Sequence, residues 1–167
     1  IATRPKRPRD SARMLVVGDH FKDSEVRYLP SFLSSGDILV FNNTRVIPAR
    51  LSGLRDGVKV QLTLDRELGN GRWRALALPA RKLKVGSNLT FQSDLTAVVV
   101  SKGNRGSVEL DFDVDAATIL SFLKEHGTIP LPPYIERPDG PDTSDSEDYH
   151  TVYARTDCAG AAPTAGL

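Results

Sequence analysis

A dense group of hydrogen-bonding side chains follows an apolar run near the start of the chain. Residues 38–41 are continuously apolar, which favours a buried strand. Directly behind this run come two amides, a hydroxyl and two guanidinium groups: Asn42, Asn43, Thr44, Arg45 and Arg50. Ligands commonly bind at the carboxyl ends of strands in α/β sheets, so this block predicts a site for an amino-acid head group and a sugar. An asparagine-rich turn whose side chains bond their own backbone is an equally good explanation.

A second candidate stretch, residues 127–138, is rich in proline. Proline fixes the backbone, so Pro133 and its neighbours would present Tyr134 and Arg137 at low entropic cost. A rigidly held tyrosine and arginine suit stacking on a base and pairing with a phosphate or carboxylate. A stiff connector, or a P-x-x-P ligand of an SH3-type domain, would use the same residues.

The third stretch covers residues 148–155 and the small-residue tail 161–167. Tyr149 and Tyr153 are four residues apart and would share one face of a helix, with two packed core tyrosines as the simpler interpretation. Small residues in the tail would let the backbone pass close to a ligand. The candidate binding residues here are Tyr149, Thr151, Tyr153, Pro163 and Thr164.

Several kinds of site are missing from the sequence. It contains no G-x-G-x-x-G loop, no P-loop and no G-x-S-x-G elbow. The histidines, His20, His126 and His150, lack metal-ligand spacing with the single cysteine, Cys158. We therefore expect no metal.

Composition and charge are those of an ordinary soluble protein. The 167 residues are 40% apolar and 26% charged, and no apolar run approaches the roughly 18 residues of a membrane span. One cysteine cannot form an internal disulfide and fits a reducing compartment. We expect a cytoplasmic protein that does not enter membranes.

Basic residues are clustered although the net charge is only +1. Clusters of this kind neutralise nucleic-acid phosphates, although a solvated surface is the commoner explanation of any one of them. The candidate RNA-binding residues are Arg4, Lys6, Arg7, Arg81 and Lys82.

The order of predicted elements suggests an interrupted domain. A strand is expected at 13–17 and a short helix at 31–33, and short alternating strands with glycine turns fill 50–112. A helix over about 115–126 begins at Asp115 and stops at Gly127. We predict a mixed α/β fold with an inserted all-β barrel, that is, an incomplete α/β domain plus a small antiparallel β-barrel. Residues 1–52 would begin the α/β domain, 53–135 would form the barrel with its one helix, and 136–167 would return to the α/β domain.

Four stretches in register resemble the S-adenosylmethionine:tRNA ribosyltransferase-isomerase family of queuosine biosynthesis. They are residues 36–51, 129–135, 149–154 and 161–167, and the beginning of the chain also fits. The resemblance implies that the ribosyl group of S-adenosylmethionine is transferred to 7-aminomethyl-7-deazaguanine at the tRNA wobble position and isomerised. Epoxyqueuosine would form, with release of adenine and methionine, and S-adenosylmethionine would serve as ribosyl donor without a metal.

The resemblance also implies roles for the candidate residues. Asn42 to Arg45 and Arg50 would help to hold the methionine carboxylate and the sugar hydroxyls. The residues that would line the nucleoside or wobble-base side are Tyr134, Arg137, Tyr149, Thr151 and Tyr153. Pro133, Pro163 and Thr164 are further candidate substrate-binding residues. No residue is identified as the general base. Members of the family are considerably longer and continue past Leu167 with His-Phe, so we expect residues 1–167 alone not to be catalytic. We also expect a monomer.

The chain departs from the family pattern at a few positions. His150 stands where the family usually has glutamine, and residues 157–160 replace a Pro-Gly-containing run. Alignment also puts Asp23 in place of a histidine and Gln61 in place of a glutamate. If these positions are catalytic, activity would be weakened.

Two other functions fit parts of the sequence. One is a non-catalytic tRNA- or RNA-binding β-barrel fragment, comparable in logic to an OB-fold. The other is a proline-motif interaction protein without affinity for nucleic acid. Neither requires the polar block 42–50, which favours the enzyme.

Overall fold

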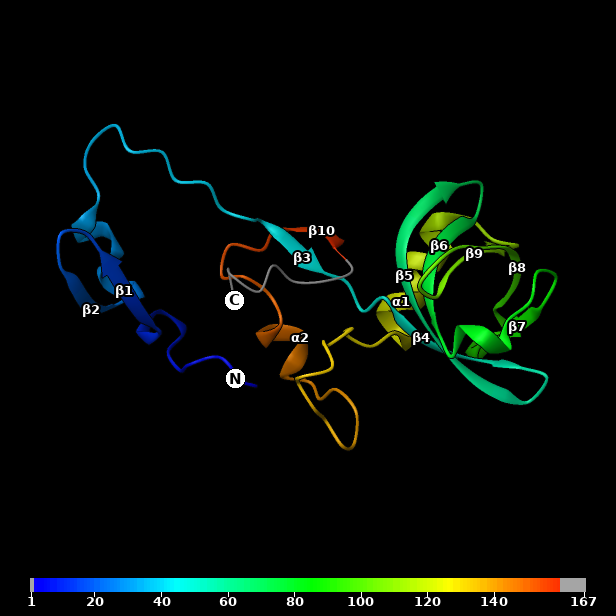
Figure 1. The fold of residues 1–167 in the computed structure, drawn as a ribbon. Helices are drawn as coiled ribbons and strands as arrows, with labels where there is room; N and C mark the ends of the chain where they lie inside the picture. The colour runs from blue at the N-terminus through cyan, green and yellow to red at the C-terminus, as the bar shows by residue number, and fades with distance from the viewer. Residues whose placement is uncertain (1, 160–167) are drawn as a thin grey trace.

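The computed structural model describes residues 2–159. Six antiparallel strands close into a barrel in the spatial order β4-β5-β6-β9-β8-β7, on the right of Figure 1. The closing contact pairs Leu54 with Thr90. The strands are β4 (Arg50–Arg55), β5 (Val58–Gly69), β6 (Arg72–Leu78), β7 (Asn88–Thr90), β8 (Thr96–Lys102) and β9 (Ser107–Phe112). The predicted antiparallel barrel is confirmed.

Alternation of apolar and polar residues places one face of each strand inside the barrel. On β5, Val60, Leu62 and Leu64 are almost completely buried, whereas Lys59 and Gln61, which alternate with them, are exposed. The hairpin from β5 to β6 turns at Asn70 and Gly71, whose φ angles are 53° and 75°. This is the left-handed pair that favours an Asn-Gly turn, as the sequence predicts.

Helix α1 (Ala116–His126) packs against the barrel core. The Asp115 side chain accepts a 2.8 Å hydrogen bond from the backbone N–H of Thr118, which is a helix N-cap. Ile119 and Leu123 are buried in the same core as the barrel strands. The helix ends at Gly127, where a Cβ would lie 1.9 Å from the Pro48 carbonyl oxygen. Glycine is therefore required at this approach.

The remaining elements are small. The hairpin of β1 (Arg13–Val17) and β2 (Phe21–Glu25) lies at the end of the molecule opposite the barrel (Figure 1). Between the two, β3 (Thr44–Val46) pairs in parallel with β10 (Thr156–Ala159). The short helices are η1 (Arg9–Ser11), η2 (Val26–Phe32), η3 (Ala80–Lys82), η4 (Gln92–Asp94) and α2 (Asp145–Asp148).

Three local predictions were wrong. Residues 38–41 form no strand, and the side chains of Ile38 and Val40 are 88% and 90% exposed. An all-apolar strand needs cover on both faces. Phe41 packs against Tyr153, but Ile38 and Val40 are left almost fully exposed. The helix expected at 31–33 is instead the 3-10 helix η2, with Pro30 inside it. Tyr149 and Tyr153 lie beyond the end of α2, so they do not share a helical face.

No helix among residues 2–159 combines the length and apolar character needed to cross a membrane.

Candidate functional site

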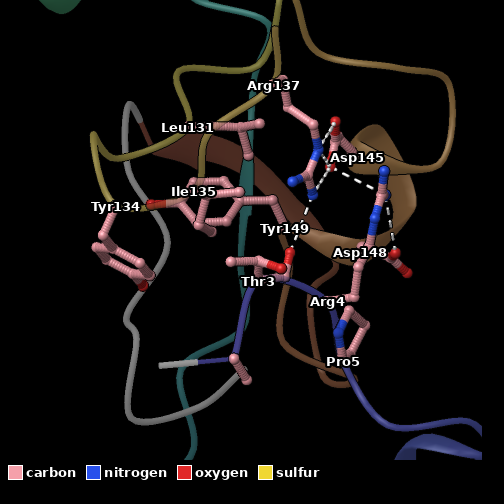
Figure 2. A pocket seen from close by; sticks show the side chains of 11 residues that line it. Thr3, Arg4, Pro5, Leu131, Tyr134, Ile135, Arg137, Asp145, Asp148 and Tyr149 are labelled. Atoms are coloured by element: carbon pink, nitrogen blue, oxygen red, sulfur yellow. Dashed lines mark hydrogen bonds and ion pairs between the residues drawn. The ribbon is translucent and has the colours of Figure 1, made fainter.

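A cavity of about 280 Å³ lies where the N-terminal segment meets the proline-rich stretch and α2 (Figure 2). Tyr134, Arg137 and Tyr149, all predicted as site residues, line it. Its other walls include Leu131 and Ile135, so most of the surface is apolar with charge at one side. The cavity therefore unites the second and third candidate stretches with residues 2–5.

Guanidinium and carboxylate groups form a closed network beside this cavity. Arg4 contacts Asp142 and donates to Asp145 Oδ1 at 3.1 Å and to Asp148 Oδ2 at 3.5 Å. Arg137 Nη2 lies 2.8 Å from Asp145 Oδ1, and Figure 2 shows both guanidinium groups directed at Asp145. The side chains of Asp145 and Asp148 are only 2% and 8% exposed. Burying these carboxylates requires partners of opposite charge, and the arginines supply them.

The N-terminal arginines, predicted to bind RNA, are part of this ion-pair network. Arg7 also pairs with Asp148, so Arg4 and Arg7 both contact carboxylates. The hydrogen bond from Arg4 lowers the pKa of Asp142 from 3.8 to about 2, and the same contact raises the pKa of Arg4. Both groups stay charged at neutral pH. A phosphate would have to compete with Asp142, Asp145 and Asp148 for these guanidinium groups, whereas Lys6 is exposed.

Arg50 connects the barrel to the proline-rich stretch. Its backbone exchanges hydrogen bonds with Thr128 at 3.1 and 2.9 Å, and its Nη2 donates to the Leu131 carbonyl at 3.1 Å. The buried Nε has no hydrogen-bond partner among the described residues. Burial lowers the pKa of Arg50, and Tyr149 opposes this effect electrostatically. Arg50 therefore holds the segment that carries Tyr134.

The Asn42 side chain, ahead of β3, makes local hydrogen bonds. Asn42 Oδ1 accepts hydrogen bonds from the Thr44 backbone N–H at 2.8 Å and from its hydroxyl at 2.5 Å. This is the self-bonded turn that was the alternative to a ligand site. The Asn42 carbonyl accepts from the Thr151 hydroxyl at 2.9 Å, and the Asn43 carbonyl accepts from the backbone of Arg155 at 2.7 Å. The first and third candidate stretches are thus held side by side.

A second cavity, of about 550 Å³, lies between β3, the end of α1 and the α2 segment. Arg45, Thr128 and His150 line it, one residue from each of the three candidate stretches, and Lys124 of α1 joins them. His150 Nδ1 accepts a 3.1 Å hydrogen bond from the Val46 backbone N–H. A side-chain carbonyl, such as that of glutamine, would be able to accept the same bond from the Val46 N–H.

The other predicted residues lie elsewhere. Pro133 is exposed and lines neither cavity, and Tyr153 packs its ring 4.0 Å from that of Phe41. Arg81 and Lys82 are on η3, which follows barrel strand β6, and they line neither cavity. Pro163 and Thr164 lie outside the described residues. Among residues 2–159 no group of three or more His, Cys, Asp and Glu side chains is arranged to hold a metal ion.

Comparison with known proteins decides the family. The whole chain, residues 1–167, matches the sequence profile of the family described as queuosine biosynthesis protein. The chain belongs to this family. The resemblance that residues 36–51 and the other three stretches suggested is therefore confirmed.

Relatives within the queuosine biosynthesis family are about twice as long. The S-adenosylmethionine:tRNA ribosyltransferase-isomerase of Rhodospirillum rubrum is 51% identical over all of this chain and 48% of its own length. That of Caulobacter vibrioides is 47% identical, over all of this chain and 51% of its own. A solved structure, the S-adenosylmethionine tRNA ribosyltransferase of Thermotoga maritima, is 32% identical with a TM-score of 0.41, covering 81% of this chain and 48% of that one. The chain spans about half the length of the relatives it matches.

Sequence reasoning missed the acidic half of the arginine network in this family member. Asp142, Asp145 and Asp148 belonged to an acidic run with no assigned role. Their spacing of three residues was the available signal, because side chains three apart share a helical face. It could not reveal that the partners would come from residues 4 and 7.

Proposed function

We propose that this chain is the N-terminal half of an S-adenosylmethionine:tRNA ribosyltransferase-isomerase. The reaction breaks the glycosidic bond to adenine and the carbon–sulfur bond to methionine, and forms a carbon–nitrogen bond to the aminomethyl group of 7-aminomethyl-7-deazaguanine in tRNA. The transferred sugar becomes an epoxycyclopentanediol, which gives epoxyqueuosine. The observation that carries the proposal is identity of about half over the whole chain with relatives of this name.

The geometry supports a division of roles between the two cavities. The one lined by Arg45, Thr128 and His150 offers polar groups suited to the methionine carboxylate and the sugar hydroxyls. The one lined by Tyr134 and Tyr149 offers aromatic and apolar surface suited to a base. In this proposal Arg50 and Arg137 are positioning residues, because the bonds of Arg50 go to Leu131 and Thr128 and those of Arg137 to Asp145 and Thr3. Removal of the proton beside the sulfonium requires a base that we do not assign.

The topology supports an interrupted domain. β3 leads into the barrel at residue 46, and the chain returns more than a hundred residues later as β10, which pairs with β3 in parallel. We propose that the barrel with α1 is inserted into an α/β domain to which the segments on either side of it contribute. The first barrel strand begins at Arg50, so the inserted part begins there and not at 53 as the sequence suggested. The exposed apolar residues 38–41 support a neighbouring strand supplied by the rest of the family's chain.

Adenine release tests the proposed function. This chain, and a fusion of it to the C-terminal half of the Rhodospirillum rubrum relative, would be incubated with S-adenosylmethionine and tRNA carrying 7-aminomethyl-7-deazaguanine. Mass spectrometry should detect adenine from the fusion. Retention of tRNA without adenine, with the Rhodospirillum rubrum enzyme active in parallel, would instead favour the second candidate, a non-catalytic RNA-binding barrel. The observation that favours this candidate is the group of exposed cations on and just after η3, Arg81, Lys82 and Lys84.

A further inference from the structure

Cations from four separate segments converge around the η3 turn of the barrel. Arg81 and Lys82 belong to η3, and Lys84 follows it. Lys102 of β8 reaches the same turn, where its Nζ donates to the carbonyls of Ala80 at 3.2 Å and Leu83 at 2.6 Å. We call the set the basic rim: Arg55, Arg81, Lys82, Lys84, Lys102 and Arg105.

The two remaining members are placed by backbone contacts. Arg55 of β4 donates from Nη1 to the Lys82 carbonyl. Arg105 precedes Gly106, whose carbonyl accepts from the Ala77 N–H at 2.9 Å, and a Cβ on Gly106 would lie 3.6 Å from the Cβ of Ala80. The basic rim is thus assembled by the closed barrel and not by one run of sequence.

Most of the charge on the basic rim is not neutralised. Within the part of the chain that the structure describes, Arg55 is the only member with a carboxylate partner, Asp56 at 3.2 Å. The other five side chains are exposed and form no ion pair there. The contacts of Lys102 go to backbone carbonyls, which fix the ammonium group without cancelling its charge. In a chain of net charge +1, six cations against one acid are a strong local excess.

We propose that the basic rim is a docking surface for the phosphate backbone of tRNA, separate from the two cavities beside α2. This inference rests on the proposed function for the identity of the RNA and adds a binding surface to it. Exposed cations distributed along a rim suit phosphates, whose recognition is electrostatic and independent of sequence. The N-terminal arginines Arg4 and Arg7 are engaged with carboxylates, so the basic rim is the stronger attractor for RNA.

Salt-dependent binding of a fluorescein-labelled tRNA transcript to this chain tests the inference. The double variant Arg81→Gln/Lys82→Gln removes two cations of the basic rim. Each lost phosphate contact lowers the slope of log K against log salt by roughly 0.7–0.9, so the slope should fall by about 1.5 and affinity at 0.1 M salt by about tenfold. Lys84→Gln/Arg105→Gln should produce a similar loss.

The matched control is Lys22→Gln/Arg66→Gln, which removes the same charge. Lys22 lies on β2. Arg66 lies on β5 and pairs with Arg74 of β6, away from the end of β6 that leads into η3. Far-ultraviolet circular dichroism checks that every variant is folded. Equal losses in control and rim variants, or no loss in either, would overturn the inference; in the second case an acidic protein would become the better partner.

Adenine release by the fusion with the C-terminal half is a separate readout. Rim variants that bind tRNA normally would remove this inference and leave the ribosyl-transfer proposal intact. If tRNA binding depends on the basic rim but the fusion releases no adenine, the docking surface is supported and the proposed ribosyl-transfer activity is ruled out.

Discussion

Arg4 Nη1 lies 3.1 Å from Asp145 Oδ1, although 141 residues separate the two in the chain. The pair fastens the N-terminal segment to α2, on the side of the fold that carries Tyr149. Asp145 is almost completely buried, and its ion-pair partners are Arg4 and Arg137. Residues 2–5 are therefore part of the candidate site.

Removal of Arg4 should loosen this attachment. Arg4→Gln is expected to lower the thermal midpoint by several degrees, since Asp145 and Asp148 lose one of their cations. Arg4→Lys should lower the thermal midpoint by less than Arg4→Gln does. It should still lower it, because an ammonium group lacks the planar guanidinium fork that reaches three carboxylates. Thermal circular dichroism measures both.

A control for this prediction is Arg13→Gln. Arg13 pairs with Asp23, but the two side chains are 85% and 72% exposed, so the contact is screened by water. The thermal midpoint of Arg13→Gln should equal that of the unsubstituted chain. If Arg4→Gln behaves like Arg13→Gln, the network does not stabilise the fold.

Acid should weaken the same network through Asp142. The pKa of Asp142 is lowered in the folded state to about 2 from 3.8, so its contribution to stability is fully present above about pH 4. The contribution is lost as the pH falls toward 2, where the folded form also takes up the proton. Carbon-detected NMR titration should give a midpoint near 2, and Arg4→Gln should move it upward toward 3.8. An unchanged midpoint in Arg4→Gln would show that Arg4 is not the cause.

Leu123 should contribute strongly to the stability of the barrel and α1. Its side chain is 1% exposed in the core shared by α1 and the strands. Leu123→Ala should reduce the free energy of unfolding by about 2–5 kcal/mol, measured by urea denaturation. Leu120, in the same helix but 38% exposed, is the matched control, and Leu120→Ala should cost less than about 1 kcal/mol. Equal losses of unfolding free energy in Leu123→Ala and Leu120→Ala would show that the face of α1 carrying Leu123 is not the buried one.

His150 should protect the backbone of β3. Loss of its bond to the Val46 N–H, in His150→Ala, should accelerate deuterium exchange of that amide about fivefold, as expected for a hydrogen bond of about 1 kcal/mol. His150→Gln retains an acceptor and should exchange at nearly the original rate. Identical exchange in the two variants would show that the side chain at 150 does not hold β3.

Sequence patterns by themselves determined the barrel and its helix. Strand alternation across Val58–Gly69, the Asn70-Gly71 turn and the Asp115 cap are local signals, because each depends on residues that are near neighbours in the chain. Family membership was also accessible, since residues 36–51 and three further stretches occur in order. These features need no knowledge of which distant segments meet.

The tertiary structure alone decided how the site residues are grouped. Asn42 bonds to Thr44 and Thr151, whereas Arg50, a few residues later, turns toward Leu131. The polar block 42–50 is thus divided between two places, because the chain enters the barrel within it. The ion pairs that Arg4 and Arg7 form with carboxylates could not be predicted for a related reason. An ion pair depends on distance in space, and sequence periodicity carries no information about partners 141 residues apart.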